Sequence, residues 1–157
     1  MKYIISTYKD VWQYFWQQRL IYISDEHSFY MDNVVNKIEI ELIVNMISLA
    51  VSDNVIVNVS GFCGLDKSMK SNCQVPEFHK GILKVEHNLE YGFAYNIHEK
   101  DFPVHINTQT GWVCMGNPEK NGNAVEFINN CVAVIDNNKN FVSLWLKPEK
   151  LPKFLYR

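Results

Sequence analysis

The chain has 157 residues, which fits a single domain over residues 1–157 that buries a hydrophobic core without metal or disulfide cross-links. Hydrophobic residues make up 47% and charged residues 20%, a composition that excludes an intrinsically disordered chain. The formal net charge is -2 and no long basic block occurs, so we do not expect direct binding of nucleic acid.

The sequence also lacks the signals of a membrane-embedded or exported protein. Met1-Lys2 leads directly into a short apolar run without the small-residue cleavage site of a signal peptide. The most apolar stretch, residues 38–51, is interrupted by polar residues and falls short of the roughly 20 residues that span a bilayer. We therefore expect a cytoplasmic protein with no membrane partner, in which four cysteines stay reduced: Cys63, Cys73, Cys114 and Cys131.

In chain order, the first predicted elements are a short strand at residues 3–6 and a helix. Thr7 and Asp10 have a spacing that resembles a capping box, which predicts a helix from about Tyr8 to Gln18. A helix this short needs tertiary contacts to persist, so we expect its apolar side chains in the core: Val11, Trp12, Phe15 and Trp16.

Residues 34–51 carry two conflicting patterns. Ile38, Ile40 and Leu42 alternate with glutamates, which is typical of a strand. Polar residues also recur at intervals of three and four, which places them on one stripe of a helix: Lys37, Glu41, Asn45, Ser48 and Ser52. We favour the second pattern and predict a long helix, buried on most sides, with Asp32 as its N-cap.

The rest of the chain is dominated by β-prone segments between turn residues. Residues 61–80 predict a long irregular loop, a kind of segment that is often functional, and the Asn-rich residues 136–140 predict a hairpin turn. The predicted strands are 55–59, 81–87, 90–98, 103–107, 111–115, 124–136 and 141–146. Together these elements predict an α+β domain with two N-terminal helices packed on a largely antiparallel sheet of about five to seven strands.

No spacing of residues predicts a catalytic or metal site. The cysteines include no C-x-x-C pair, so no metal is expected, and no glycine motif for phosphate or another cofactor occurs. Cys114 lies in the stretch GWVCMGNP, where apolar neighbours disfavour a thiolate and the continuation is a polar loop rather than a helix. We therefore do not expect an enzyme; the alternative is a small enzyme that pairs a histidine with Cys63, Cys73 or Cys114.

A second alternative is a module that binds single-stranded nucleic acid. Tyr91, Phe93 and Tyr95 alternate, which places them on one face of a strand and resembles a platform for stacking bases. The surrounding charges are glutamates, which repel phosphate. We therefore expect these three aromatic side chains to pack in the core.

The stretch from His105 to Pro152 supplies the one family resemblance. A strand ending in TGWVCMG, then AVEFINNCVAVID, a turn, and FVSLWLKP resemble the C-terminal half of certain bacterial immunity proteins. These proteins belong to contact-dependent growth inhibition and other polymorphic toxin systems. The resemblance implies a cytoplasmic, non-catalytic protein that binds a cognate toxin C-terminal domain, and it carries over no binding residues.

If the partner is a nuclease toxin, its nucleic-acid site is expected to be basic. Acidic side chains would then steer association and complement the toxin cleft. Aromatic anchors would come from the 61–80 loop or from exposed tyrosines. The acidic residues that we expect to bind the toxin are Asp25, Glu26, Asp32, Glu86, Glu90, Glu99 and Asp101.

Overall fold

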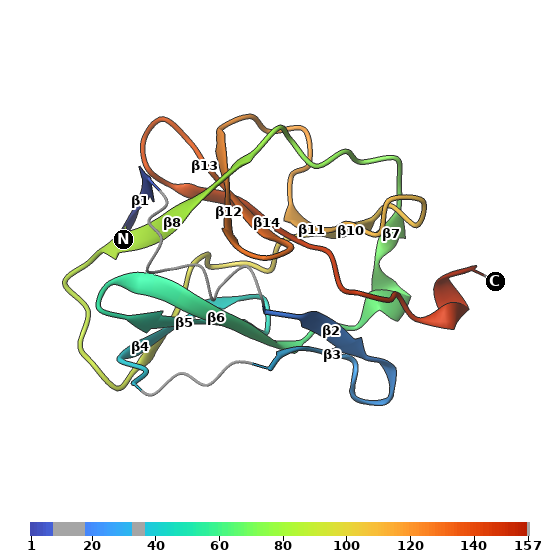
Figure 1. The fold of residues 1–157 in the computed structure, drawn as a ribbon, viewed down its shortest axis with the longest axis horizontal. Helices are drawn as coiled ribbons and strands as arrows, with labels where there is room; N and C mark the ends of the chain where they lie inside the picture. The colour runs from blue at the N-terminus through green and yellow to red at the C-terminus, as the bar shows by residue number, and fades with distance from the viewer. Residues whose placement is uncertain (8–17, 33–36, 157) are drawn as a thin grey trace.

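The computed structural model describes residues 1–7, 18–32 and 37–156, and the strands among them form one mixed sheet of 14 strands (Figure 1). The only helical elements among these residues are short 3-10 turns: η2 Ser24–Glu26, η3 Leu65–Lys67 and η4 Lys153–Tyr156. The predicted α+β class is therefore wrong, because the described chain is nearly all β. None of these helical turns has the length and apolarity needed to cross a membrane.

The sheet curls so that its two halves face each other across one core (Figure 1). The first layer contains β2 Leu20–Ile23, β3 Ser28–Met31, β6 Val55–Phe62, β5 Ile47–Ser52, β4 Ile40–Val44 and β9 Ala94–Asn96. The second layer contains β7 Met69–Lys70, β10 Val104–Ile106, β11 Val113–Gly116, β14 Phe141–Leu146, β13 Cys131–Ile135 and β12 Asn123–Ile128. The strands that join the layers are β8 His79–Glu86 and its partner β1 Lys2–Thr7.

The helix predicted over residues 34–51 is the clearest error. Residues 33–36 lie outside the described ranges, and residues 40–52 form the antiparallel hairpin β4–β5. Ile40 and Leu42 point into the core, so the alternating pattern was the correct signal. Asn45 adopts a positive φ of 56° in the turn, which asparagine tolerates and a helix interior does not allow. The other predicted helix, residues 8–18, falls almost entirely outside the described residues.

Most strand predictions in the C-terminal two thirds are confirmed. The strand over 141–146 matches β14, and the turn at 136–140 connects β13 to β14. The segment 124–136, predicted as one strand, is divided into β12 and β13 by a turn at Asn129-Asn130, where Asn130 has a φ of 64°. The segment 90–98 is mostly irregular, and only β9 within it is a strand.

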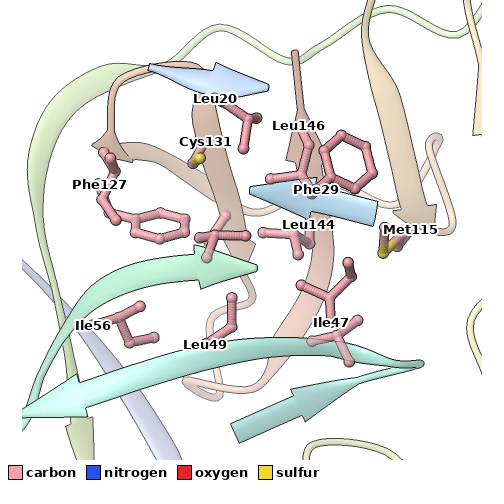
Figure 2. Packing of buried hydrophobic residues seen from close by; sticks show 14 of the residues in the cluster. Leu20, Phe29, Ile47, Leu49, Ile56, Met115, Phe127, Cys131, Leu144 and Leu146 are labelled. Carbon is pink, nitrogen blue, oxygen red and sulfur yellow. The ribbon is translucent and has the colours of Figure 1, made fainter. Parts of the chain in front are cut away.

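In the second layer, β11, β13 and β14 are buried on both faces, which explains their nearly continuous apolar sequences. Its inner face meets the first layer, where Phe29 of β3 and Leu49 of β5 pack with Leu144 and Leu146 of β14 (Figure 2). The side chains on the opposite side of the second layer form a separate apolar cluster around Trp112 and Trp145. Residues 71–78 pack against that outer cluster through Cys73, Val75 and Phe78. Part of the predicted 61–80 loop therefore acts as a structural strap over the second layer.

Asn107 holds this strap in place. Its side chain is 2% exposed, its amide nitrogen Nδ2 donates to the Cys73 carbonyl at 2.9 Å, and its Oδ1 accepts from the backbone N–H groups of Gln109 and Thr110. One amide side chain therefore fixes both the strap and the turn between β10 and β11.

Replacing Asn107 with alanine is expected to lower the free energy of unfolding by about 1–3 kcal/mol, because three partly buried backbone groups lose their partner. Urea unfolding followed by tryptophan fluorescence measures the change. Asn117→Ala is the matched control, since Asn117 makes a similar turn bond to Glu119 N–H but is exposed. We expect that control to cost less than about 0.5 kcal/mol; equal losses in both variants would contradict a special role for Asn107.

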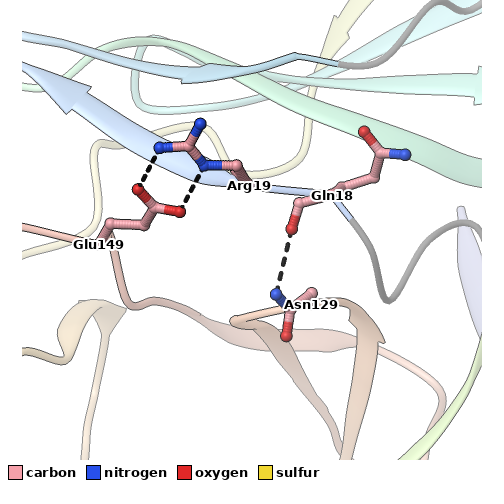
Figure 3. A network of polar contacts seen from close by, with 4 residues as sticks. All are labelled: Gln18, Arg19, Asn129 and Glu149. Atoms are coloured by element: carbon pink, nitrogen blue, oxygen red, sulfur yellow. Dashed lines mark hydrogen bonds and ion pairs between the residues drawn. The ribbon is translucent and has the colours of Figure 1, made fainter.

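Polar contacts also tie the beginning of β2 to the C-terminal half (Figure 3). Arg19 forms a two-pronged ion pair with Glu149 at 2.7 Å for each bond, which lowers the pKa of the Glu149 carboxyl. Asn129 Nδ2 donates to the Gln18 carbonyl at 3.1 Å, and Glu149 N–H donates to the Leu20 carbonyl at 2.9 Å. These contacts join the beginning of β2, in the first layer, to the turn before β13 and to the segment after β14, in the second layer.

Candidate binding surface

Three of the four thiols are placed where they cannot act as nucleophiles. Cys63, Cys114 and Cys131 are buried, and burial raises the pKa of each thiol, in Cys63 to about 12. Cys114 lies on β11 in the cluster behind the strap, as a packed strand residue. Cys73 is half-buried in the strap itself. Among the described residues, no group of three or more His, Cys, Asp or Glu side chains is placed to hold a metal ion.

Thiol labelling at pH 8 is expected to separate Cys73 from the other cysteines. In the folded protein a chromogenic disulfide reagent should modify Cys73 first, because the other three thiols are buried and protonated. Cys63, Cys114 and Cys131 should react only at the rate of global unfolding. The Cys73→Ser variant should therefore show no fast phase, whereas a fast phase in that variant would contradict the placement of the buried thiols.

A hollow of about 790 Å³ lies between the N-terminus and the 97–103 loop. Its charged lining has both signs, with Lys100 and Lys120 against Asp101 and Asp136. The Asp136 carboxylate already accepts the backbone N–H groups of Asn140 and Asn138 at 2.9 Å, and these bonds lower its pKa. The Asp136 carboxylate therefore holds the 136–140 turn in shape.

The outward side of the first layer is a more distinctive surface. Strand pairing places Ser60 beside Ser48, Ser48 beside Ile43, and Ile43 beside Asn96, so one row of side chains crosses β6, β5, β4 and β9. We call the half-buried and exposed side chains on this side the outer face; they include Ile21, Ile23, Ser28, Tyr30, Glu41, Ile43, Met46, Ser48, Ser60, Phe62, Ala94 and Asn96.

Large apolar side chains are exposed on the outer face. Tyr30 is 46% exposed, Phe62 45% and Met46 62%, and serines lie between them on the neighbouring strands. The corresponding side of the second layer is covered by the strap. Apolar groups that lie together in the open are typical of a protein-binding surface.

The outer face continues to the edge of the sheet at β9. Ile38, Tyr91 and Phe93 are 49%, 65% and 56% exposed, and a shallow hollow of about 350 Å³ lies between residues 38–41 and 92–94. The prediction that Tyr91 and Phe93 pack in the core is therefore wrong, because both precede β9 in an irregular segment. Tyr95, on β9 itself, is half-buried and packs against the core.

The predicted acidic residues do not form one patch. Asp25 and Glu26 lie in η2 before β3 and Asp32 follows β3, so these three flank one side of the outer face. Glu90 precedes β9 at the opposite side, and its backbone N–H donates to the Tyr95 hydroxyl at 3.2 Å. Glu86 is 4.0 Å from Lys139 at the end of β8, and Glu99 lies in the loop after β9. Asp101, in the same loop, lines a hollow of about 280 Å³ together with Met46 and Phe62 of the outer face.

The sequence analysis did not name the three most exposed apolar residues of the outer face, Tyr30, Phe62 and Met46, as binding residues. Phe62 lies in the segment expected to supply anchors, and Tyr30 is one of the tyrosines that were candidates as a group. The alternation in Ser28-Phe29-Tyr30-Met31 could have identified Tyr30, because Phe29 and Met31 face the core. Met46 could not be found in this way once its segment was assigned to a helix.

Comparison with protein-family models finds no match to the chain, and comparison with curated proteins finds none either. Neither comparison therefore bears on the resemblance to immunity proteins. The outer face and the β9 edge are interpreted below from their own chemistry.

Proposed function

We propose that the chain is an immunity protein that binds and neutralises a cognate toxin domain, a nuclease, in the cytoplasm. The observation that supports it most directly is the outer face, where Tyr30, Phe62 and Met46 are exposed on one side of the first layer. Aromatic side chains at the centre of an interface supply most of the binding free energy of protein complexes. The resemblance of residues 105–152 to immunity proteins supports the same function.

The charges around the outer face favour a basic partner. Asp25, Glu26 and Asp32 flank it at β3, Glu41 lies on it at β4, and Glu90 flanks it at β9. A nuclease binds the phosphates of nucleic acid with cationic side chains, and carboxylates at the rim attract such a surface during association.

The test is binding of the purified chain to the toxin domain encoded beside its gene. We expect co-purification and a submicromolar Kd, and we expect the Tyr30→Ser/Phe62→Ser double variant to bind at least about thirtyfold more weakly. Tyr156→Ser is the matched control, because Tyr156 is 61% exposed but lies in η4 near the C-terminus. Absence of wild-type binding at micromolar concentration, or equal affinity of the double variant, contradicts the proposal.

A second candidate, a module for single-stranded nucleic acid, draws on the exposed rings of Tyr91 and Phe93. The carboxylates of Glu41 and Glu90 beside them disfavour phosphate, so we rank this candidate lower. Salt-dependent binding of an oligonucleotide that is lost in Phe93→Ser would favour it over the toxin inhibitor.

A further inference from the structure

The β9 edge has backbone groups that are suited to pairing with another strand. β9 is the last strand of the first layer, and its parallel ladder with β4 uses the Phe93 carbonyl and the Ile97 N–H, which bond to Glu41 N–H and the Ile43 carbonyl. Backbone groups alternate in direction along a strand, so those of Ala94 and Asn96 point away from β4. Both residues are exposed, and no strand in the described part of the chain pairs with that edge.

We propose that an extended, basic segment of the partner protein adds to β9 as a further strand. This inference rests on the proposed function, and it specifies how the partner is held. The backbone of the added segment would bond to the free N–H and carbonyl groups of Ala94 and Asn96. Pairing of this kind supplies affinity through the main chain and specificity through alternate side chains.

The charge of the segment follows from the residues beside Ala94. Ala94 pairs with Glu41, so both side chains lie on the outer face, and a partner residue next to Ala94 would be two strands, roughly 10 Å, from Glu41. The small Ala94 side chain leaves room for a long lysine or arginine to reach the Glu41 carboxylate. The ring of Phe93 lies next to that of Tyr95, with centroids 6.4 Å apart, so it flanks the edge and not the row that contains Ala94 and Glu41.

The added strand would also extend an existing surface. Asn96 and Ala94 end the rows of side chains that cross the first layer, so a segment paired with β9 would lie at the border of the outer face. The same partner could then contact Tyr30 and Phe62 with its folded body.

The experiment is a calorimetric titration of Ala94→Pro and Ala94→Ser with the toxin domain encoded beside the gene. Proline removes the outward N–H without removing a bond to β4, whereas serine keeps the N–H and a small side chain. We expect Ala94→Pro to weaken binding at least about tenfold, and Ala94→Ser to stay within about threefold of wild type. Glu41→Gln should reduce the dependence of the Kd on salt concentration.

Strand addition is overturned if Ala94→Pro binds as tightly as Ala94→Ser while the Tyr30→Ser/Phe62→Ser variant loses binding. Failure of the wild-type chain to bind overturns the proposed function instead. Hydrogen exchange of the wild-type chain gives an answer even if Ala94→Pro does not fold. Slowing of the Ala94 and Asn96 amides in the complex supports strand addition, and unchanged exchange overturns it.

Discussion

Replacing Trp145 with alanine is expected to lower the free energy of unfolding by about 3–5 kcal/mol. Trp145 is 0% exposed and lies on β14, opposite Cys114 of β11 and Val132 of β13. Its ring is part of the cluster between the second layer and the strap, so truncation would leave a large cavity there. A domain of ordinary stability would lose a large fraction of its stability, since typical values are about 5–15 kcal/mol.

Urea unfolding followed by far-UV circular dichroism measures this change without relying on the deleted fluorophore. Trp145→Phe keeps most of the apolar volume and removes the bond that Trp145 Nε1 donates to Ser143 Oγ at 3.1 Å. Combining it with Ser143→Ala removes both partners of that bond, and we expect the double variant to lose less than about 2 kcal/mol. A Trp145→Ala variant as stable as wild type would contradict the packing of this cluster.

The C-terminal half of the fold was predictable because its turns and strands have strong local signals. The backbone N–H groups of Asn138 and Asn140 donate to the Asp136 carboxylate within the turn itself, and β14 is apolar except at Ser143 because both of its faces are buried. What the sequence could not reveal is that residues 71–78 cover one of those faces. That cover depends on long-range contacts, such as the bond between Asn107 and Cys73, that no local pattern encodes.

Residues 34–51 were assigned wrongly because two periodicities fitted the same residues, whereas the strands predicted at 3–6 and 55–59 match β1 and β6. Glu41 and Ser48 fit one stripe of a helix, but they also face outward on β4 and β5, where strand alternation requires polar residues. The turn at Asn45 decides between the patterns, and a positive φ at one asparagine is a weak local signal. The missed turn also hid the outer face, because Met46, Ile43 and Ser48 come together only when this segment is a hairpin.

The sequence analysis named the kinds of side chain that occur on the candidate surface, but not most of the residues that form it. Acidic side chains and exposed aromatic rings were both expected, and both occur on the first layer. The acidic residues nevertheless separate into groups, because strand order places β3 and β9 at opposite sides of the layer. Position in a sheet of this kind follows from pairing between distant segments, which composition and spacing do not specify.

Replacing Gly116 with alanine is expected to lower the free energy of unfolding by about 2–5 kcal/mol. Gly116 ends β11 beside Ser143 of β14, with a φ of +127° that residues with side chains rarely adopt. A β-carbon there would lie 2.6 Å from the Val142 carbonyl oxygen and 3.0 Å from the Ser143 Cα atom, both of them backbone atoms. The two strands would have to separate at this point, which would also disturb the bond from Gly116 N–H to the Pro103 carbonyl at 3.0 Å.

Gly92→Ala is the matched control that separates conformational strain from steric overlap. Gly92 also has a positive φ, of +84°, but no atom lies within 4 Å of the position that its β-carbon would occupy. We expect Gly92→Ala to cost about 1–2 kcal/mol, the strain of the backbone conformation alone. Chemical denaturation of both variants gives the difference between their free energies of unfolding. Equal losses would mean that the close approach of β11 and β14 contributes nothing, whereas a larger loss in Gly116→Ala would show that steric overlap at the end of the GWVCMGNP segment adds to the backbone strain.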